Sequence, residues 1–229
     1  MHEYTLFSQI PATRHDQVLN ILAGVTGAQP FNYNEQHCIY AQQHDVKPAT
    51  IKKQKQQQSS QGRSYERLIR PLESEPGSHD DLPWVLRSEQ TPEPGSPAVI
   101  SRGVTESNLR DSDAVAFGDP SKYRLTAQYI ASGHRFIQNN TIIRIYRILP
   151  YTSETSPLLR APPVVAELTP LDPSGAYIVE ACIRVEDRSN ARLNDQATKE
   201  LLEFKKTLDG AIDLHVPDRL ALDTRVKGV

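Results

Sequence analysis

The sequence predicts a mainly β protein of the α+β class, a many-stranded antiparallel β-barrel with two flanking helices. First, runs with a period of two residues recur along the chain and outnumber the helical patterns by about four to one. Second, proline outnumbers glycine, 17 to 11, so many residues are expected in loops. Third, residues 122–149 form a ribbon with more apolar surface than one sheet face needs. We expect residues 1–229 to form a single barrel domain.

The central ribbon carries the strongest pattern. Apolar residues from Tyr123 to Ala131 alternate with more polar neighbours, as in a half-buried strand. Gly133 is expected to break this strand, and residues 138–140 to form a turn. A second run from Thr141 to Leu149 is almost wholly apolar. Its two arginines, Arg144 and Arg147, lie at opposite parity, so neither face is polar and both need a cover.

The N-terminal region predicts one strand and one helix. Residues 3–10 place Tyr4, Leu6 and Ile10 on one face, and residues 13–27 follow with helical spacing. Thr13 is the expected N-cap, with Asp16 in a variant capping box, and Gly24 and Gly27 offer a stop. Residues 31–40 are a weaker strand.

The middle of the chain changes character at residues 44–64, which are rich in Lys and Gln and poor in apolar side chains. We interpret this stretch as a disordered insertion loop, because ordering it would cost entropy without burying surface. Contact with DNA phosphates or an import receptor is the alternative. Short strands are expected at residues 65–70, 82–87, 98–105 and 114–117.

The C-terminal region predicts an antiparallel pair, residues 164–168 with 176–186, around a turn at 172–175. Its second strand has a clean apolar face, so Glu180 and Glu186 are expected to point outward if that face is the core. A helix follows, with Asn190 or Asn194 as cap and Gly210 as end; its apolar stripe is Leu193, Ala197, Leu201, Phe204 and Leu208. Residues 211–216 are a possible last strand.

No catalytic, cofactor or metal constellation emerges from the sequence. His37-Cys38 could form half of a metal site, but we favour the interpretation that they are two strand residues on opposite faces. His79-Asp80-Asp81 is interpreted as a solvated polar stretch. His134 and Arg135 after Gly133 could surround a substrate anion, but a bend beside a ribbon corner is favoured. With two cysteines a reducing compartment is expected. The net charge of −2 argues against direct nucleic-acid binding, and no apolar run approaches the ~18 residues of a membrane span.

Taken together, the order of elements resembles subunit 18 of the Mediator complex of RNA polymerase II transcription, in its fungal form. The resemblance rests on Met1-His2-Glu3-Tyr4 opening the first strand, the helix around 16–23, Gly133-His134-Arg135-Phe136 with its Asn-Asn turn, the C-terminal helix and the tail Pro217-Asp218-Arg219-Leu220. It implies a non-catalytic nuclear subunit of a coactivator that links gene-specific regulators to RNA polymerase II. It also implies a barrel that pairs with subunit 20 and receives a C-terminal helix of subunit 8.

For the partner interface we single out Ile130, Ile142, Tyr146, Ile148 and Leu202; their role as core residues is the alternative. The first four are expected on the ribbon face opposite Tyr123–Ala131. The second function weighed is a tunnel-type triphosphatase-like enzyme with metal-dependent phosphate release. It would need paired strand carboxylates, and the one Glu-x-Glu, Glu73-Ser74-Glu75, is expected in a loop. A barrel lumen lined with carboxylates and basic residues would support the enzyme, and an apolar lumen would remove it.

Overall fold

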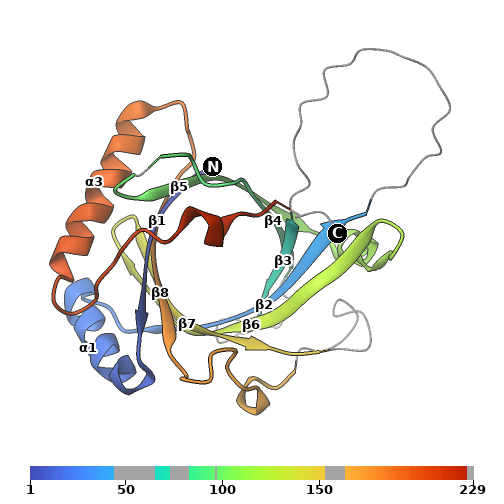
Figure 1. Ribbon diagram of the computed structural model, residues 1–229, viewed down its shortest axis with the longest axis horizontal. Helices are drawn as coiled ribbons and strands as arrows, with labels where there is room; N and C mark the ends of the chain where they lie inside the picture. The colour runs from blue at the N-terminus through green and yellow to red at the C-terminus, as the bar shows by residue number, and fades with distance from the viewer. Residues whose placement is uncertain (44–64, 73–82, 96, 153–162, 226–229) are drawn as a thin grey trace.

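A computed structural model describes residues 1–43, 65–72, 83–95, 97–152 and 163–225 (Figure 1). The strands close into a barrel in the order β1-β5-β4-β3-β2-β6-β7-β8, and each pair of neighbouring strands is antiparallel. The strands are β1 (His2–Ile10), β2 (Phe31–Gln42), β3 (Tyr65–Pro71), β4 (Trp84–Glu89), β5 (Ile100–Leu109), β6 (Tyr123–Gln138), β7 (Thr141–Pro150) and β8 (Tyr177–Val185). The predicted fold class is confirmed. The expected insertion at 44–64 and the pair Glu73-Ser74-Glu75 lie outside the described residues.

The β6–β7 ribbon is the longest hairpin of the barrel. Asn139 adopts a left-handed conformation with φ of 52°, and Gln138 pairs with Thr141 across the turn. This confirms the turn that its asparagines predict. Gly133 does not break the strand, because β6 runs through it from Tyr123 to Gln138. The irregularity lies elsewhere, between Ile39 and Tyr40 in the pairing of β2 with β6.

Two longer helices flank the barrel, as expected: α1 (His15–Thr26) and α3 (Ala191–Thr207). Asn190 caps α3 by accepting a hydrogen bond from the Leu193 amide, and Gly27 ends α1 in the left-handed conformation. Thr13 is not a cap: it lies inside a short 3-10 helix, η1 (Ala12–Arg14), which leads into α1. Gly24 lies inside α1 and is not a stop.

Three predicted strands are wrong. Residues 114–117 lie in helical turns, α2 (Asp111–Val115) and η2 (Ala116–Gly118), and Val165–Glu167 form a further 3-10 helix, η3. β8 therefore pairs with β1 and β7 instead of with 164–168. Residues 211–216 contribute one isolated bridge, His215 with Phe7, and η4 (Arg219–Leu222) follows. In the described part of the chain, no helix is long and apolar enough to span a membrane.

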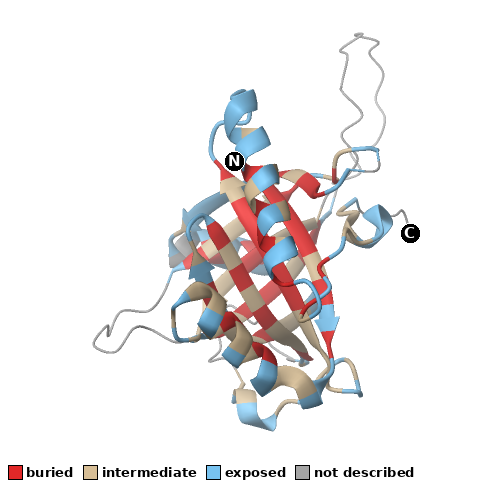
Figure 2. Ribbon diagram, turned by 90° about the vertical axis from the view of Figure 1, so that its left-hand side faces the viewer, coloured by how far each residue is buried: buried red, intermediate tan, exposed pale blue. Residues whose placement is uncertain are grey.

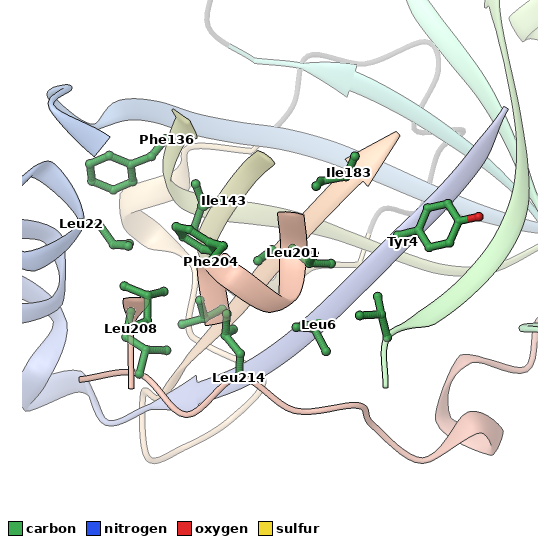
Figure 3. Packing of buried hydrophobic residues seen from close by; sticks show 14 of the residues in the cluster. Tyr4, Leu6, Leu22, Phe136, Ile143, Ile183, Leu201, Phe204, Leu208 and Leu214 are labelled. Atoms are coloured by element: carbon green, nitrogen blue, oxygen red, sulfur yellow. The ribbon is translucent and has the colours of Figure 1, made fainter. Parts of the chain in front are cut away.

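The main hydrophobic core lies outside the barrel wall, beneath the helices. Strand residues such as Leu6, Ile143 and Ile183 pack against Leu22 of α1 and Leu201 of α3 (Figure 3). Figure 2 shows the buried strand residues behind α3, whose outer surface is exposed. The alternating strands thus bury their apolar face against helices and turn the other face into the barrel lumen. A smaller cluster, including Cys38 and Trp84, packs under α2 and η2.

Candidate functional site

The barrel lumen holds a cavity of about 410 Å³. Its wall is built from the strand positions that alternate with the core residues. Charged residues dominate much of it: Glu35, Arg67, Arg87, Glu89, Arg102, Glu106, Arg135, Arg144, Glu180 and Arg184. The lumen therefore mixes charged with apolar side chains, and its carboxylates and arginines are the part that a tunnel enzyme would require.

At one side of the lumen, a fully buried carboxylate forms ion pairs with three arginines. Glu3 lies 2.7 Å from Arg87, 3.2 Å from Arg184 and 3.5 Å from Arg102. Burial by itself would raise the pKa of the Glu3 carboxyl. The three guanidinium groups outweigh that penalty, so this pKa lies below its ordinary value and Glu3 is ionised at neutral pH.

Glu89 is the second centre of the same network. It contacts Arg87 at 2.6 Å, Arg102 at 2.8 Å and Arg67 at 3.6 Å. Burial again opposes ionisation, but these arginines hold the pKa of Glu89 at about 2. Arg87 also donates a hydrogen bond to Glu106. Each of these carboxylates forms ion pairs with more than one arginine, so the buried charges stabilise one another inside the barrel.

A second polar group lines another part of the lumen wall. Arg144 donates to Glu180 at 3.1 Å, and the Tyr33 hydroxyl donates to Glu35 at 2.9 Å. His37 stacks on Tyr129, and its Nδ1 has no hydrogen-bond partner among the described residues. Burial lowers the pKa of His37, which keeps its ring neutral at pH 7.

The position of Glu180 corrects one expectation. The apolar face of β8 is the core, as predicted, but that core lies outside the barrel, so Glu180 points into the lumen. Glu186 follows the end of β8 and is exposed. His37 and Cys38 lie on opposite faces of β2, one in the lumen and the other in the outer cluster, as favoured over half of a metal site.

Glu3, Glu180 and Cys182 bring three possible metal ligands together, with ligand atoms within 4.8 Å of one another. Guanidinium groups already occupy this place. Arg144 contacts both Glu180 and Cys182, and Arg87, Arg102 and Arg184 surround Glu3. A divalent cation would have to compete with these fixed positive charges, so the donor set does not fit a metal site.

The five predicted interface residues do not form one surface. The register pairs Ile142 with Ile137, Tyr146 with Gly133 and Ile148 with Ala131, and Ile142, Tyr146 and Ile148 line the lumen. The prediction that they share a face with Ile130 is wrong. Ile130 points to the other side of β6 and is fully buried within the chain. The prediction placed even-numbered residues of both strands on one face. In the structure, even-numbered residues of β7 lie opposite odd-numbered residues of β6, so the two sets fall on different faces.

Leu202 is placed differently from the other four. It is half-buried on α3 and lines two adjacent surface hollows. One hollow follows the outer face of α3 beside Lys199 and Lys206. The other lies between α3 and the segment that carries Ile212 and Leu214. Leu193 of the predicted stripe is 41% exposed, whereas Ala197, Leu201, Phe204 and Leu208 are buried as expected.

Gly133 has a packing role instead of the predicted bend. A Cβ built on it would lie 1.9 Å from the carbonyl oxygen of Ile145 on the neighbouring strand. Tyr33 and Tyr146 are its partners on either side, and their rings meet edge to face at 5.8 Å. The bare backbone thus allows β6 and β7 to approach closely beneath an aromatic pair.

The lumen network escapes sequence reasoning because its residues come from five different strands, β1, β3, β4, β5 and β8, which only the closed barrel brings together. The available signal is alternation: Arg67 and Ile69 on β3, and Val85, Arg87 and Glu89 on β4, share one face. The expectation that apolar strand faces point into a barrel conceals this signal. Together, fold and site define a closed, helix-flanked β-barrel whose interior holds ion-paired arginines and carboxylates.

The sequence belongs to a known family with this architecture. The model of the family described as Med18 protein matches residues 2–225, so the chain is a member of that family. It is 27% identical to "Mediator of RNA polymerase II transcription subunit 18" of Aspergillus fumigatus, over 99% of this chain and 100% of that one. It is 29% identical to the protein of the same name from Coccidioides immitis, with the same coverage of both chains.

Solved structures support the fold. The chain is similar to one in the structure of the Schizosaccharomyces pombe Mediator head module, with a TM-score of 0.70 and 23% identity over 94% of this chain and 98% of that one. It is also similar to the PH1819 protein from Pyrococcus horikoshii, with a TM-score of 0.51 and 10% identity over 95% and 96% of the two chains. At these identities the likeness concerns the fold alone.

Proposed function

We propose that this chain is a non-catalytic subunit of the Mediator coactivator complex, acting in the nucleus as a scaffold between gene-specific regulators and RNA polymerase II. The family match over residues 2–225 carries the proposal. The similarity to the named relatives extends along their whole length, which supports a shared role. The expected partners are the other head subunits, with subunit 20 as the paired barrel and the C-terminal helix of subunit 8.

The outer side of α3 is the first candidate for the partner surface. Leu202 is half-buried where two hollows meet, so an apolar side chain from a partner helix would extend existing packing. Charges of both signs flank it, Lys199 and Lys206 against Asp195 and Glu203. Such a mixed rim favours one orientation of a charged partner helix over the reverse.

The open end of the lumen is the second candidate. Ile142 lies there beside Ile137, which is 45% exposed, and Phe31 on β2 is 54% exposed. A partner could contact Ile142 without entering the barrel. Tyr146 and Ile148 also line the lumen, and Ile130 is fully buried within the chain, so we favour the interior alternative for these three.

The tunnel-type triphosphatase is the rival function, and the charged lumen is the observation in its favour. Against it, the lumen carboxylates Glu3, Glu89 and Glu180 are held by arginines at 2.6–3.2 Å. Metal-dependent phosphate release from a nucleoside triphosphate is the direct assay. The scaffold account expects no release above the level of a heat-denatured sample, and turnover that disappears in a Glu3→Gln variant would favour the enzyme.

The partner surface is tested by a matched pair of substitutions on one helix. Leu202 packs partly against the main core, so Leu202→Asp should lower the melting temperature somewhat. At a temperature where the variant is still folded, it should reduce capture of the other head subunits by roughly tenfold or more. Leu193→Asp, an exposed site on the first turn of α3, is the control and should leave capture unchanged. Equal capture by the two variants would remove this surface from the proposal.

A further inference from the structure

The C-terminal segment after the last buried residue lies across the barrel instead of continuing its wall. Leu214 is fully buried, and His215 is tied to Phe7 of β1 by two backbone hydrogen bonds of 2.9 and 2.7 Å. From there the segment crosses towards β3 and β4, drawn in red in Figure 1. We call residues 217–225 the strap.

The strap is held to the barrel mainly by hydrogen bonds. The Tyr65 amide donates to the Thr224 carbonyl at 2.9 Å, and the Thr224 hydroxyl donates to the Glu89 carbonyl at 2.8 Å. The Arg219 Nε donates to the Pro92 carbonyl at 2.8 Å. No strap residue is buried as a whole, although the Asp223 side chain is 4% exposed, and no apolar side chain of the strap is fully covered. Segments with so little buried apolar area are the ones that open locally.

Beneath the strap lies the arginine network. A hollow of about 210 Å³ is lined by Arg67, Arg87, Glu89 and Arg102 on one side and by residues 221–224 on the other. Leu222 lines both this hollow and the main lumen cavity. The strap therefore places an apolar side chain between two polar cavities, so that its departure would join them and admit water.

From this arrangement we infer that the strap is a lid, which opens about the anchored end at Leu214 and His215 while the barrel stays folded, and so controls access to the charged lumen. Closure keeps water from the ion pairs around Glu89, which strengthens them in a medium of lower dielectric constant. Opening exposes a surface carrying Arg67, Arg87 and Arg102. This inference is independent of the proposed Mediator role, because it concerns the isolated chain.

Hydrogen exchange of the full chain tests the lid directly. The Tyr65 amide is bonded to the strap, so it should exchange faster than amides inside the β6–β7–β8 wall, such as that of Ile145. The double variant Leu222→Ala/Thr224→Val should accelerate exchange at Tyr65 by roughly tenfold or more and leave the wall amides unchanged. Leu220→Ala, at a strap position that is 65% exposed, is the matched control and should behave as the unmodified chain.

Two outcomes would overturn the lid. In one, the Tyr65 amide of the unmodified chain exchanges only as fast as the wall amides, so that opening requires global unfolding. In the other, the double variant exchanges at Tyr65 no faster than the Leu220→Ala control. Should the double variant fail to fold, Arg219→Ala removes the bond to Pro92 and is compared with the same control. Exchange at Tyr65 that is faster than in Leu220→Ala would again support the lid, and equal exchange would overturn it.

Discussion

Replacing Glu89 with Gln removes one centre of the lumen network with little change in side-chain size. In the folded chain the pKa of Glu89 is about 2, against an ordinary value of 4.5, because Arg67, Arg102 and Arg87 outweigh the cost of burial. That difference corresponds to about 3 kcal/mol of stability at neutral pH. Glu89→Gln should therefore lower the free energy of unfolding by about 3 kcal/mol at pH 7, the range expected when one partner of a buried ion pair is lost.

The contribution of Glu89 to stability should decrease as the pH falls. A carboxylate with a lowered pKa stabilises the fold fully above its unfolded value and loses this contribution as the pH falls from about 4.5 to about 2. The difference in free energy of unfolding between the unmodified chain and Glu89→Gln should therefore become smaller as the pH falls from about 4.5 to about 2. Urea titration followed by Trp84 fluorescence measures the free energy of unfolding of each protein at each pH. Trp84 is the one tryptophan, and it is buried on the same strand as Glu89.

Glu203→Gln is the matched control, because Glu203 forms an exposed pair with Lys199 at 3.9 Å. Its substitution should change the free energy of unfolding by less than about 0.5 kcal/mol. A loss below about 1 kcal/mol for Glu89→Gln at pH 7, or a gap that stays constant as the pH falls to about 2, would refute the role given to the lumen network.

Three further substitutions test the packing. Gly133→Ala should cost about 2–3 kcal/mol of unfolding free energy because the new Cβ meets the Ile145 carbonyl, whereas Gly24→Ala in open space within α1 should raise stability by about 0.5–1 kcal/mol; a Gly133→Ala melt equal to that of the unmodified chain would contradict the close approach. Leu201→Ala should cost about 2–5 kcal/mol, and Leu202→Ala clearly less, by chemical denaturation; equal losses would mean that the core beneath α3 is misplaced. Asn139→Val should destabilise the ribbon by about 1–2 kcal/mol, and Asn139→Gly should not, because the position has positive φ; equal melting temperatures for the two variants would argue against that turn.

The fold class follows from the sequence because strand alternation is a local property. The strands of the N-terminal half and of the ribbon lie near their predicted places, and the apolar stripes of both longer helices predict them correctly. The errors at 114–117 and 164–168 have a common cause. A short apolar run of four or five residues has the same composition in a strand as in a helical turn, and only tertiary packing decides between them.

The side of each strand that faces the core could not be predicted from the sequence. Periodicity shows that two faces differ, but it does not say which one lies inside a closed barrel. Here the helices cover the apolar face from outside, so Glu180 points inward and Ile142, Tyr146 and Ile148 line the lumen. The interface prediction depended on this choice and on the parity across the β6–β7 hairpin, and Ile130 shows that both are set by tertiary structure.

Assembly with the Mediator head is the central claim, and it is tested by affinity purification of the tagged full chain from a nuclear extract at moderate salt. The account predicts that the other head subunits are recovered with it in comparable amounts, and that Leu202→Asp reduces their recovery while Leu193→Asp does not. Recovery of the unmodified chain as a lone monomer under these conditions would contradict it.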